Sequence, residues 1–284
     1  MREVVGHLIQ QRGCRIVALA EVRQQSVLHL IPEEARETWD ELRDLSGDRH
    51  DFDVAIAFDR ARLTLIEHRW VRGSHAGQRV RAGLVGTFCT EDESDWLIVV
   101  AAHWRSDMGN AEDAGDRRLA AAASLREAIA ASVDDVAAGT PVLILGDFNA
   151  EPFSRPFGAA LPTARSRAEV QRRRPRSGTD LLFYNASWRL LGERFPWSRD
   201  DGPPSLAGIY RLDGSSAPTA WRTFDQVLVS PSLLGGDAWT LDERALAIVD
   251  DACIYDRDKS RPCRPFDHLP IVGHLERFTS TRAP

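Results

Sequence analysis

The chain has almost no lysine: of its 36 lysine and arginine residues, only Lys259 is a lysine. Arginine binds phosphate through paired hydrogen bonds, although the codon bias of a GC-rich genome explains the same excess without any function. The net charge of −6 gives no overall attraction for polyanions. Binding to nucleic acid would therefore have to depend on a local basic surface.

Cysteine and long apolar runs are also scarce. The four cysteines are far apart and include no Cys-x-x-Cys pair, which argues against a zinc site or a redox motif. Cys253 and Cys263 could pair only in an exported protein. Apolar runs such as 97–102 are too short to cross a bilayer, and Glu3, His7 and Arg12 interrupt any leader-like stretch at the start. We therefore expect a cytoplasmic protein without a membrane segment.

One segment is more informative than the rest, the run Pro-Val-Leu-Ile-Leu-Gly-Asp-Phe-Asn-Ala-Glu-Pro at residues 141–152. Its apolar half predicts a buried strand, which ends at Gly146, where unusual backbone angles are tolerated. Asp147 and Asn149 follow two residues apart, so in an extended chain they point to the same side. Two interpretations stay open here: a local turn in which Asp and Asn bond the backbone, or a ligand site at the edge of a sheet.

Other predicted strands carry ionisable residues at their ends in the same way. Glu21 follows 16–20, His103 follows 97–102, Asp225 precedes 227–229, and Asp267 and His268 precede 269–272. One such residue beside a strand is common, but five such places, the Asp147 strand included, argue against coincidence.

The order of predicted elements is not a regular alternation of strands and helices. Patterning predicts helices over 2–12, 32–45 and 111–136, and strands over 15–20, 52–58, 63–71, 79–89, 96–103, 141–145, 224–229 and 267–275. Hairpins mixed with crossover helices indicate mixed sheets covered by helices, in a single domain over 1–284. The loop-rich part around 151–220 is longer than a compact domain usually carries, so we expect it to form substrate-binding loops.

That loop-rich part holds a basic run and several tryptophans. Residues 165–176 include six arginines and one glutamate, and they form either a patch that attracts a phosphate backbone or a solvated loop. Trp188, Trp197 and Trp221 could stack on bases, with ordinary packing as the simpler interpretation.

Taken together, the motifs resemble the endonuclease/exonuclease/phosphatase superfamily, the group of deoxyribonuclease I, abasic-site endonucleases, sphingomyelinases and inositol phosphatases. The resemblance implies an α/β fold, a four-layer sandwich in which two mixed β-sheets pack face to face and are flanked by helices. The matching pieces are Ala-Leu-Ala-Glu21-Val, Ala-His103-Trp-Arg105-Ser, Leu-Gly-Asp147-Phe-Asn149-Ala-Glu-Pro, Phe-Asp225-Gln-Val and Phe-Asp267-His268-Leu-Pro-Ile.

The resemblance also implies a metal-dependent phosphodiester hydrolase. Glu21 and Asp267 would ligate Mg²⁺, with Mn²⁺ as an alternative, because hard cations take oxygen ligands and suit phosphate substrates. Asp147 would position or deprotonate the attacking water, and Asn149 would orient it.

Two histidines and two arginines would complete that site. His268, held by Asp267 or Asp225, would contact the scissile phosphate or act as a base, and His103 would act as a general acid or phosphate donor. Arg105 and Arg81 would bind phosphate, with a solvated arginine and a structural salt bridge as the respective alternatives.

The sequence departs from the resemblance at its start. Family members open with a strand that carries an active-site asparagine, whereas Met1 here begins at the following predicted helix. Either the true start lies upstream and could bring a signal segment, or the chain lacks a central strand and exposes a strand edge.

Three functions follow from these observations. The first is a nuclease or related phosphodiesterase with a nucleic acid as partner. The second is a phosphatase or phosphodiesterase acting on a small or lipid phosphoester, and the third is a weakened, purely binding member that lacks the asparagine strand.

Overall fold

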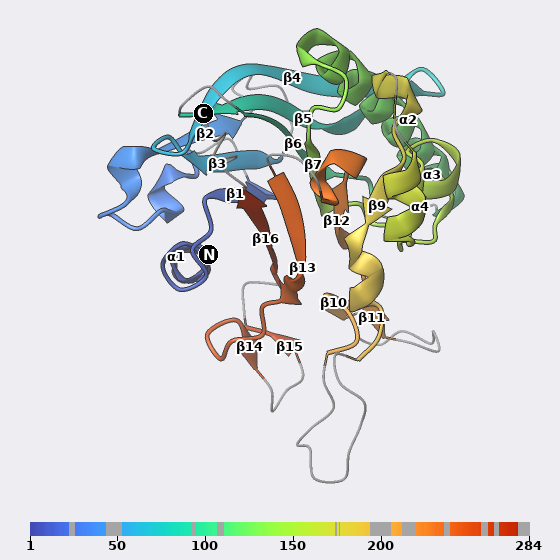
Figure 1. Ribbon diagram of the computed structural model, residues 1–284. Coiled ribbons are helices and arrows are strands. Elements are labelled where there is room, and N and C mark those ends of the chain that lie inside the picture. Colours follow the sequence, from blue (N-terminus) through green and yellow to red (C-terminus); the bar gives the residue numbers. More distant parts are fainter. Residues whose placement is uncertain are drawn as a thin grey trace, which may run out of the picture.

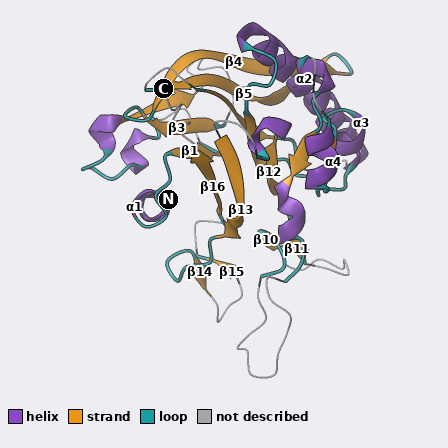
Figure 2. Ribbon diagram, viewed as in Figure 1, coloured by secondary structure: helices purple, strands orange, loops and turns teal. Residues whose placement is uncertain are grey.

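The computed structural model describes residues 1–22, 26–43, 53–91, 95–106, 111–173, 175, 177–193, 206–211, 220–235, 239–256, 261–263 and 267–277. Figures 1 and 2 show sheets in the middle of the molecule and helices outside them. In chain order the elements are α1 (Arg2–Gln10), β1 (Ile16–Leu19), η1 (Leu28–Leu30), η2 (Arg36–Thr38), β2 (Trp39–Arg43), β3 (Ala55–Asp59), β4 (Leu63–His75), β5 (Gln78–Thr90), β6 (Trp96–His103), α2 (Ala111–Val136), β7 (Val142–Asp147), α3 (Arg155–Ala159), β8 (Thr163–Ala164), α4 (Arg167–Arg172), η3 (Gly178–Asp180), β9 (Phe183–Asn185), η4 (Ala186–Leu190), β10 (Tyr210–Arg211), β11 (Trp221–Arg222), β12 (Asp225–Val229), η5 (Pro231–Leu233), β13 (Trp239–Ile248), β14 (Tyr255–Asp256), β15 (Arg261–Pro262) and β16 (Ile271–Arg277).

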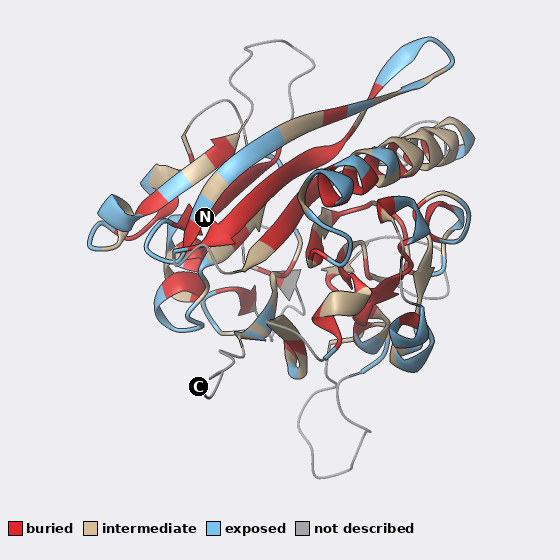
Figure 3. Ribbon diagram, turned by 45° about the horizontal axis from the view of Figure 1, so that its top comes forward, coloured by how far each residue is buried: buried red, intermediate tan, exposed pale blue. Residues whose placement is uncertain are grey.

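The largest sheet has seven strands in the order β4-β5-β6-β7-β12-β9-β8. Its neighbours are antiparallel except for β6 with β7 and β8 with β9, so the sheet is mixed, as expected. Helix α2 packs across β4 and β5 on one face, where Leu125 and Ile129 share a buried cluster with Val85 and Val100 (Figure 1). Figure 3 shows this burial as the red inner side of α2 against the red central strands.

The opposite face of the large sheet packs against a second layer of strands. This layer contains the three-stranded sheet β1-β3-β2 and the two-stranded sheet β13-β16. Phe88 and Val99 of the large sheet share one core cluster with Phe58 of β3 and Leu246 of β13.

Helix α1 covers the far side of the β1-β3-β2 sheet. Its Val5 and Ile9 are buried with Val17 of β1 and Ala57 of β3 in a separate cluster. The layers therefore follow the order helix, sheet, sheet, helix, which confirms the predicted four-layer sandwich.

The second layer consists of two separate sheets, one containing β1 and the other containing β16. Among the described strands, β1 pairs only with β3, and β16 pairs only with β13. Helix α1 is the first element of the chain, and the first strand after it is β1, in agreement with the expected order.

The predicted helix over 32–45 is wrong. Its described part, 32–43, contains turns, the short 3₁₀ helix η2 and the strand β2, which pairs antiparallel with β3. Trp39 and Leu42 are buried there, and the Glu41 carboxylate accepts hydrogen bonds from the backbone N–H groups of Val27 and Leu28. Tertiary pairing with β3 therefore overrides the helical spacing of the apolar residues.

The ten-residue strand β13 was not predicted. Its register against β16 shifts between Asp242 and Ala247, so the apolar alternation expected of a regular strand is interrupted. The helix over 111–136 is confirmed with the same bounds, and no described helix is long and apolar enough to span a bilayer.

Candidate active site

Three ionisable residues meet at one edge of the large sheet because of strand register. β6 ends at His103 and β7 ends at Asp147, and these two residues are paired in the parallel ladder. β12 begins at Asp225, which is paired with Asp147 in the antiparallel ladder. Neighbouring strands lie about 4.8 Å apart, so the three side chains stand side by side.

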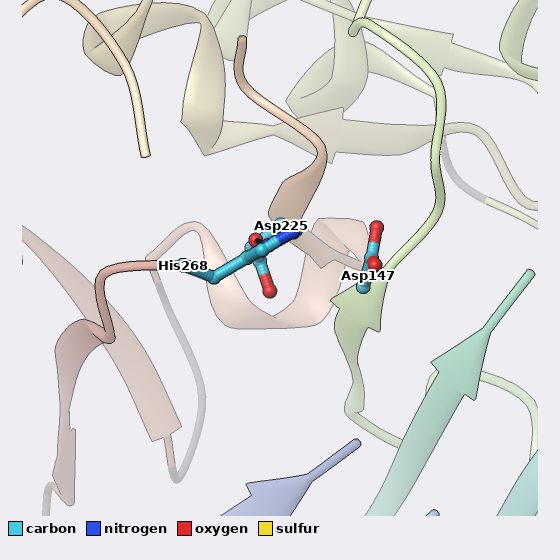
Figure 4. Close-up of side chains that lie close together, drawn as sticks. All are labelled: Asp147, Asp225 and His268. Carbon is cyan, nitrogen blue, oxygen red and sulfur yellow. Dashed lines mark hydrogen bonds and ion pairs between the residues drawn. The ribbon is translucent and has the colours of Figure 1, made fainter. Parts of the chain in front are cut away.

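His268 reaches this edge from the second layer. It precedes β16, and its position is fixed because Leu269 donates a backbone hydrogen bond of 3.0 Å to the Ile209 carbonyl. The Tyr210 ring lies 4.6 Å from the imidazole, between centroids. Figure 4 shows His268, Asp225 and Asp147 converging, and their ligand atoms all lie within 4.8 Å of one another.

The electrostatics of this cluster favour a cationic histidine. Burial alone would lower the pKa of His268, but the hydrogen bond and charge of Asp225, with the charge of Asp147, raise it to about 9. Burial and the neighbouring Asp225 carboxylate raise the pKa of Asp147 to about 6, against the opposing charges of His268 and His103. The Asp147 and Asp225 carboxylates offer oxygen atoms of the kind that a hard divalent cation binds, whereas a cationic His268 offers no lone pair to a metal.

The partner of His268 is now defined. Its Nδ1 lies 2.5 Å from Asp225 Oδ2, whereas Asp267 is exposed and influences His268 mainly through its charge. Of the two carboxylates that the sequence left open, Asp225 therefore makes the contact.

His103 belongs to a second histidine–carboxylate pair. Its Nδ1 lies 2.9 Å from Asp53 Oδ2, and its Nε2 lies 3.7 Å from Asp147 Oδ2. Burial would lower the pKa of His103, but Asp53 and Asp147 raise it. Arg81 Nη1 lies 2.9 Å from Asp53 Oδ1, so this predicted phosphate ligand takes part in a salt bridge beside the site.

Sequence reasoning missed Asp53. The residue stands directly before the buried segment Val54–Phe58, which is the same pattern that pointed to Asp225 and Asp267. A search for an ionisable residue directly before each apolar segment would have found Asp53.

Asn149 and Asp147 form the local turn that the sequence left open, and they still face the site. The Asn149 N–H donates to Asp147 Oδ1 over 2.8 Å, and Asn149 Nδ2 donates to Asp147 Oδ2 and to the Trp104 carbonyl, each over 3.0 Å. Asn149 adopts a left-handed backbone with φ of 47°. The turn therefore fixes the orientation of the Asp147 carboxylate.

The two predicted metal ligands, Glu21 and Asp267, lie outside the three-residue cluster. Glu21 is exposed and has a left-handed φ of 56°, and the next residue, Val22, donates a backbone hydrogen bond to the Asp53 carbonyl over 3.0 Å. This contact places Glu21 next to the segment that carries Asp53. Their role as metal ligands stays a prediction.

The other predicted binding residues are spread over the surface. Arg105 is exposed after β6, and its carbonyl accepts a hydrogen bond from Arg118. Arg165, Arg172 and Arg173 are exposed, whereas Arg167 is bound to Glu243. Arg174, Arg176 and Trp197 lie outside the described residues, and Trp188 and Trp221 are half-buried.

Solved structures share the fold of this chain. A human Nocturnin catalytic domain with bound sulfate aligns with 98% of this chain and 86% of its own, at 15% identity and a TM-score of 0.58. A Bacteroides thetaiotaomicron mannosyl-6-phosphatase aligns over 97% and 90%, at 14% identity and a TM-score of 0.62. A D. rerio TDP2 complexed with a single-strand DNA product aligns over 97% and 91%, at 12% identity and a TM-score of 0.57.

Sequence comparison gives the family directly. No curated protein sequence matches the chain significantly. Residues 1–191, however, match the profile of the endonuclease/exonuclease/phosphatase family. Together with the four-layer sandwich and the histidine–carboxylate pairs at one edge of the large sheet, this match establishes that the chain belongs to the endonuclease/exonuclease/phosphatase family.

Proposed function

We propose that the chain is a divalent-metal-dependent hydrolase of phosphodiester bonds and that it acts as a nuclease. The observation that carries the proposal is the convergence of Asp147, Asp225 and His268, with His103 on the adjoining strand. Two imidazoles and two carboxylates at one edge supply a base, an acid and a cationic phosphate ligand within one site.

Asp147 is the group that acts on water. Its pKa of about 6 leaves it largely ionised at neutral pH yet able to accept a proton, which is the range a general base needs. Asn149 holds both carboxylate oxygens in place, so the base is oriented before substrate binds.

His268 and His103 bind the phosphate and move protons. With a pKa of about 9 and its Nδ1 at Asp225, His268 is cationic at neutral pH, which leaves Nε2 as the donor for a phosphoryl oxygen of the substrate. His103, whose pKa is also raised, is placed by Asp53 to protonate the leaving oxygen. Arg81 and Arg105 add positive charge near the substrate.

Metal binding rests on the carboxylates around this edge. The predicted ligands Glu21 and Asp267 would hold Mg²⁺ or Mn²⁺, while Asp147 acts on water and Asp225 holds His268. When bound, the cation would polarise the phosphoryl oxygen and stabilise developing charge.

A phosphatase acting on a small or lipid phosphoester is the second candidate. The net charge of −6 favours it, because a small ester depends less on long-range attraction than a polyanion does. The same histidines and carboxylates serve both reactions. The nuclease and the phosphatase therefore differ in the substrate that they turn over.

The test measures turnover of plasmid DNA, RNA, bis-p-nitrophenyl phosphate and a sugar phosphate with Mg²⁺, with Mn²⁺ and with chelator. We expect metal-dependent cleavage of a nucleic acid, lost in Asp147→Ala and His268→Ala and retained in Asp135→Ala, a carboxylate that binds Arg69 on the surface. Polymer cleavage should weaken steeply with salt, whereas hydrolysis of a small ester should respond little. Turnover of the sugar phosphate alone would select the phosphatase, and binding without any turnover would select the weakened member.

A further inference from the structure

An exposed phenylalanine packs against a half-buried tryptophan near the candidate active site. Phe153 is 67% exposed, and the Trp188 ring lies 6.2 Å from it, between centroids, at an interplanar angle of 52°. The Arg165 guanidinium sits 5.5 Å from the Trp188 centroid, within the range of a cation–π contact. We call Phe153, Trp188 and Arg165 the aromatic platform.

Hydrogen bonds along β12 place η4, which contains Trp188, beside the site. In the β9–β12 ladder Leu228 pairs with Asn185, and η4 follows directly after Asn185. The Val227 N–H donates to Ser187 Oγ over 2.8 Å, which holds η4 against β12. Because Ser187 is bonded to Val227 and Leu190 to Thr223, Trp188 of η4 lies beside the end of β12 that carries Asp225, next to the edge formed with His103 and Asp147.

Phe153 reaches that edge from the other side, through the loop after β7. Ser154 N donates to the Glu151 carbonyl over 2.8 Å, which places Phe153 at the tip of a turn. The Glu151 carboxylate accepts a 3.2 Å hydrogen bond from the N–H of Thr223, a buried residue two positions before Asp225. Thr223 Oγ1 also donates to the Leu190 carbonyl, so one buried residue ties both aromatic loops to the strand that carries Asp225.

A ligand of the exposed Phe153 ring has to suit both the apolar face of the ring and the charged Arg165 beside it. Arg165 lies over the Trp188 ring, which leaves Phe153 as the open face. Arg165 is itself exposed, and the interaction found for its guanidinium within the described part of the chain is the one with the Trp188 ring. An apolar ring beside an exposed guanidinium matches a base attached to a phosphate, whereas a purely apolar ligand would gain nothing from the charge.

Resting on the proposed nuclease function, we propose that this aromatic platform stacks a nucleobase of single-stranded nucleic acid a few nucleotides from the phosphate bound by His268 and His103. The platform then makes the enzyme prefer a strand with bases to a bare phosphodiester backbone. Phe153 provides the stacking surface, and Arg165 places positive charge for an adjacent phosphate.

The experiment compares two fluorescent oligomers of about ten units, one of thymidine and one of abasic tetrahydrofuran phosphodiester. Anisotropy with chelator present measures binding, and cleavage with Mg²⁺ measures turnover. We expect the wild type to bind the thymidine oligomer about tenfold more tightly, and Phe153→Ala and Phe153→Leu to lose that preference. Phe153→Tyr should keep it, as should Ile66→Ala, an exposed apolar control beside Pro141 at the opposite end of β7.

Each result has a definite meaning. Equal binding of both oligomers by the wild type overturns the inference, and so does a preference that survives in Phe153→Ala. Base-dependent binding that Phe153→Ala removes, without metal-dependent cleavage of either oligomer, supports the platform and counts against the nuclease function.

Discussion

The imidazole of His268 donates from Nδ1 to Oδ2 of Asp225 over 2.5 Å, and this hydrogen bond joins the two β-layers. Asp225 begins a strand of the large sheet, whereas His268 leads into β16 of the second layer. The contact determines the charge of the histidine, which is the property that the proposed chemistry needs.

Replacing Asp225 by Asn should lower the pKa of His268. The carboxylate supplies both the hydrogen bond and the largest charge that oppose the effect of burial, so without it the pKa falls from about 9 towards or below 6.5. His268 would then be mostly neutral at pH 7.5, and turnover should fall at least roughly 100-fold. NMR titration of the imidazole and steady-state kinetics check this, with Asp135→Asn as the control; an unchanged His268 pKa would contradict it.

Replacing Asp53 by Asn should reduce kcat roughly 10- to 100-fold with little change in KM. The Asp53 carboxylate fixes the orientation of His103 and raises its pKa, but the residue itself is one contact removed from Asp147. The pH profile of kcat should therefore shift to lower pH on the limb that His103 controls, and Asp53→Glu should restore part of the rate. An equal loss in Asp40→Asn, an exposed carboxylate on β2, would show that the effect is general rather than local.

Replacing Gly146 by Ala should destabilise the fold. Gly146 has φ of 148°, and a Cβ there would lie 2.0 Å from the Ala102 carbonyl oxygen on the neighbouring strand. The strained backbone alone costs about 1–3 kcal/mol, and the clash adds to it. Urea unfolding measures the change. Gly115→Ala, in α2 with open space around the new methyl, should instead stabilise by about 0.5–1 kcal/mol; similar losses in both variants would refute the clash.

Cys14 should resist alkylation near pH 8. Burial raises the pKa of its thiol from 9.0 to about 11, although the charge of Arg12 opposes the shift. Since the thiolate is the nucleophile, iodoacetamide should modify the exposed Cys253 first, and the Cys14 rate should rise only as the pH approaches 11. The unfolded chain loses this proton earlier, so stability should fall as the pH rises from 9 towards 11. Peptide mass spectrometry gives both rates, and equal rates at pH 8 would oppose this expectation.

The family resemblance implied the four layers, and patterning predicted most of the longer strands because apolar segments with the period of a strand or helix retain their pattern in the core. The helix over 111–136 and the strand ending at Asp147 are examples. The segment 32–45 has apolar residues at helical spacing, but its state depends on pairing with β3, which lies later in the chain. The bulge in β13 removes the alternation by which a strand is recognised.

The sequence predicted the three clustered residues of the candidate site, but it missed Asp53 and did not predict the pairings. Asp147, Asp225 and His268 each stand beside an apolar segment, so their position in the sequence marked them. The choice of Asp225 over Asp267 as partner of His268, and of Asp53 as partner of His103, depends on strand register and on contacts between layers. The local pattern of apolar and ionisable residues contains no information on strand register or on contacts between layers.

The arrangement of the large sheet also determines when the active site can form during folding. Its edge joins His103 and Asp147 to Asp225, and the cluster is complete only when His268 arrives from near the end of the chain. A fragment that ended at residue 191 would contain the part that matches the family profile but neither Asp225 nor His268. Closing contacts of such long sequence separation costs chain entropy, which makes folding slow. Catalytic activity would then report that the whole chain has been synthesised and folded, which secondary structure alone would not reveal.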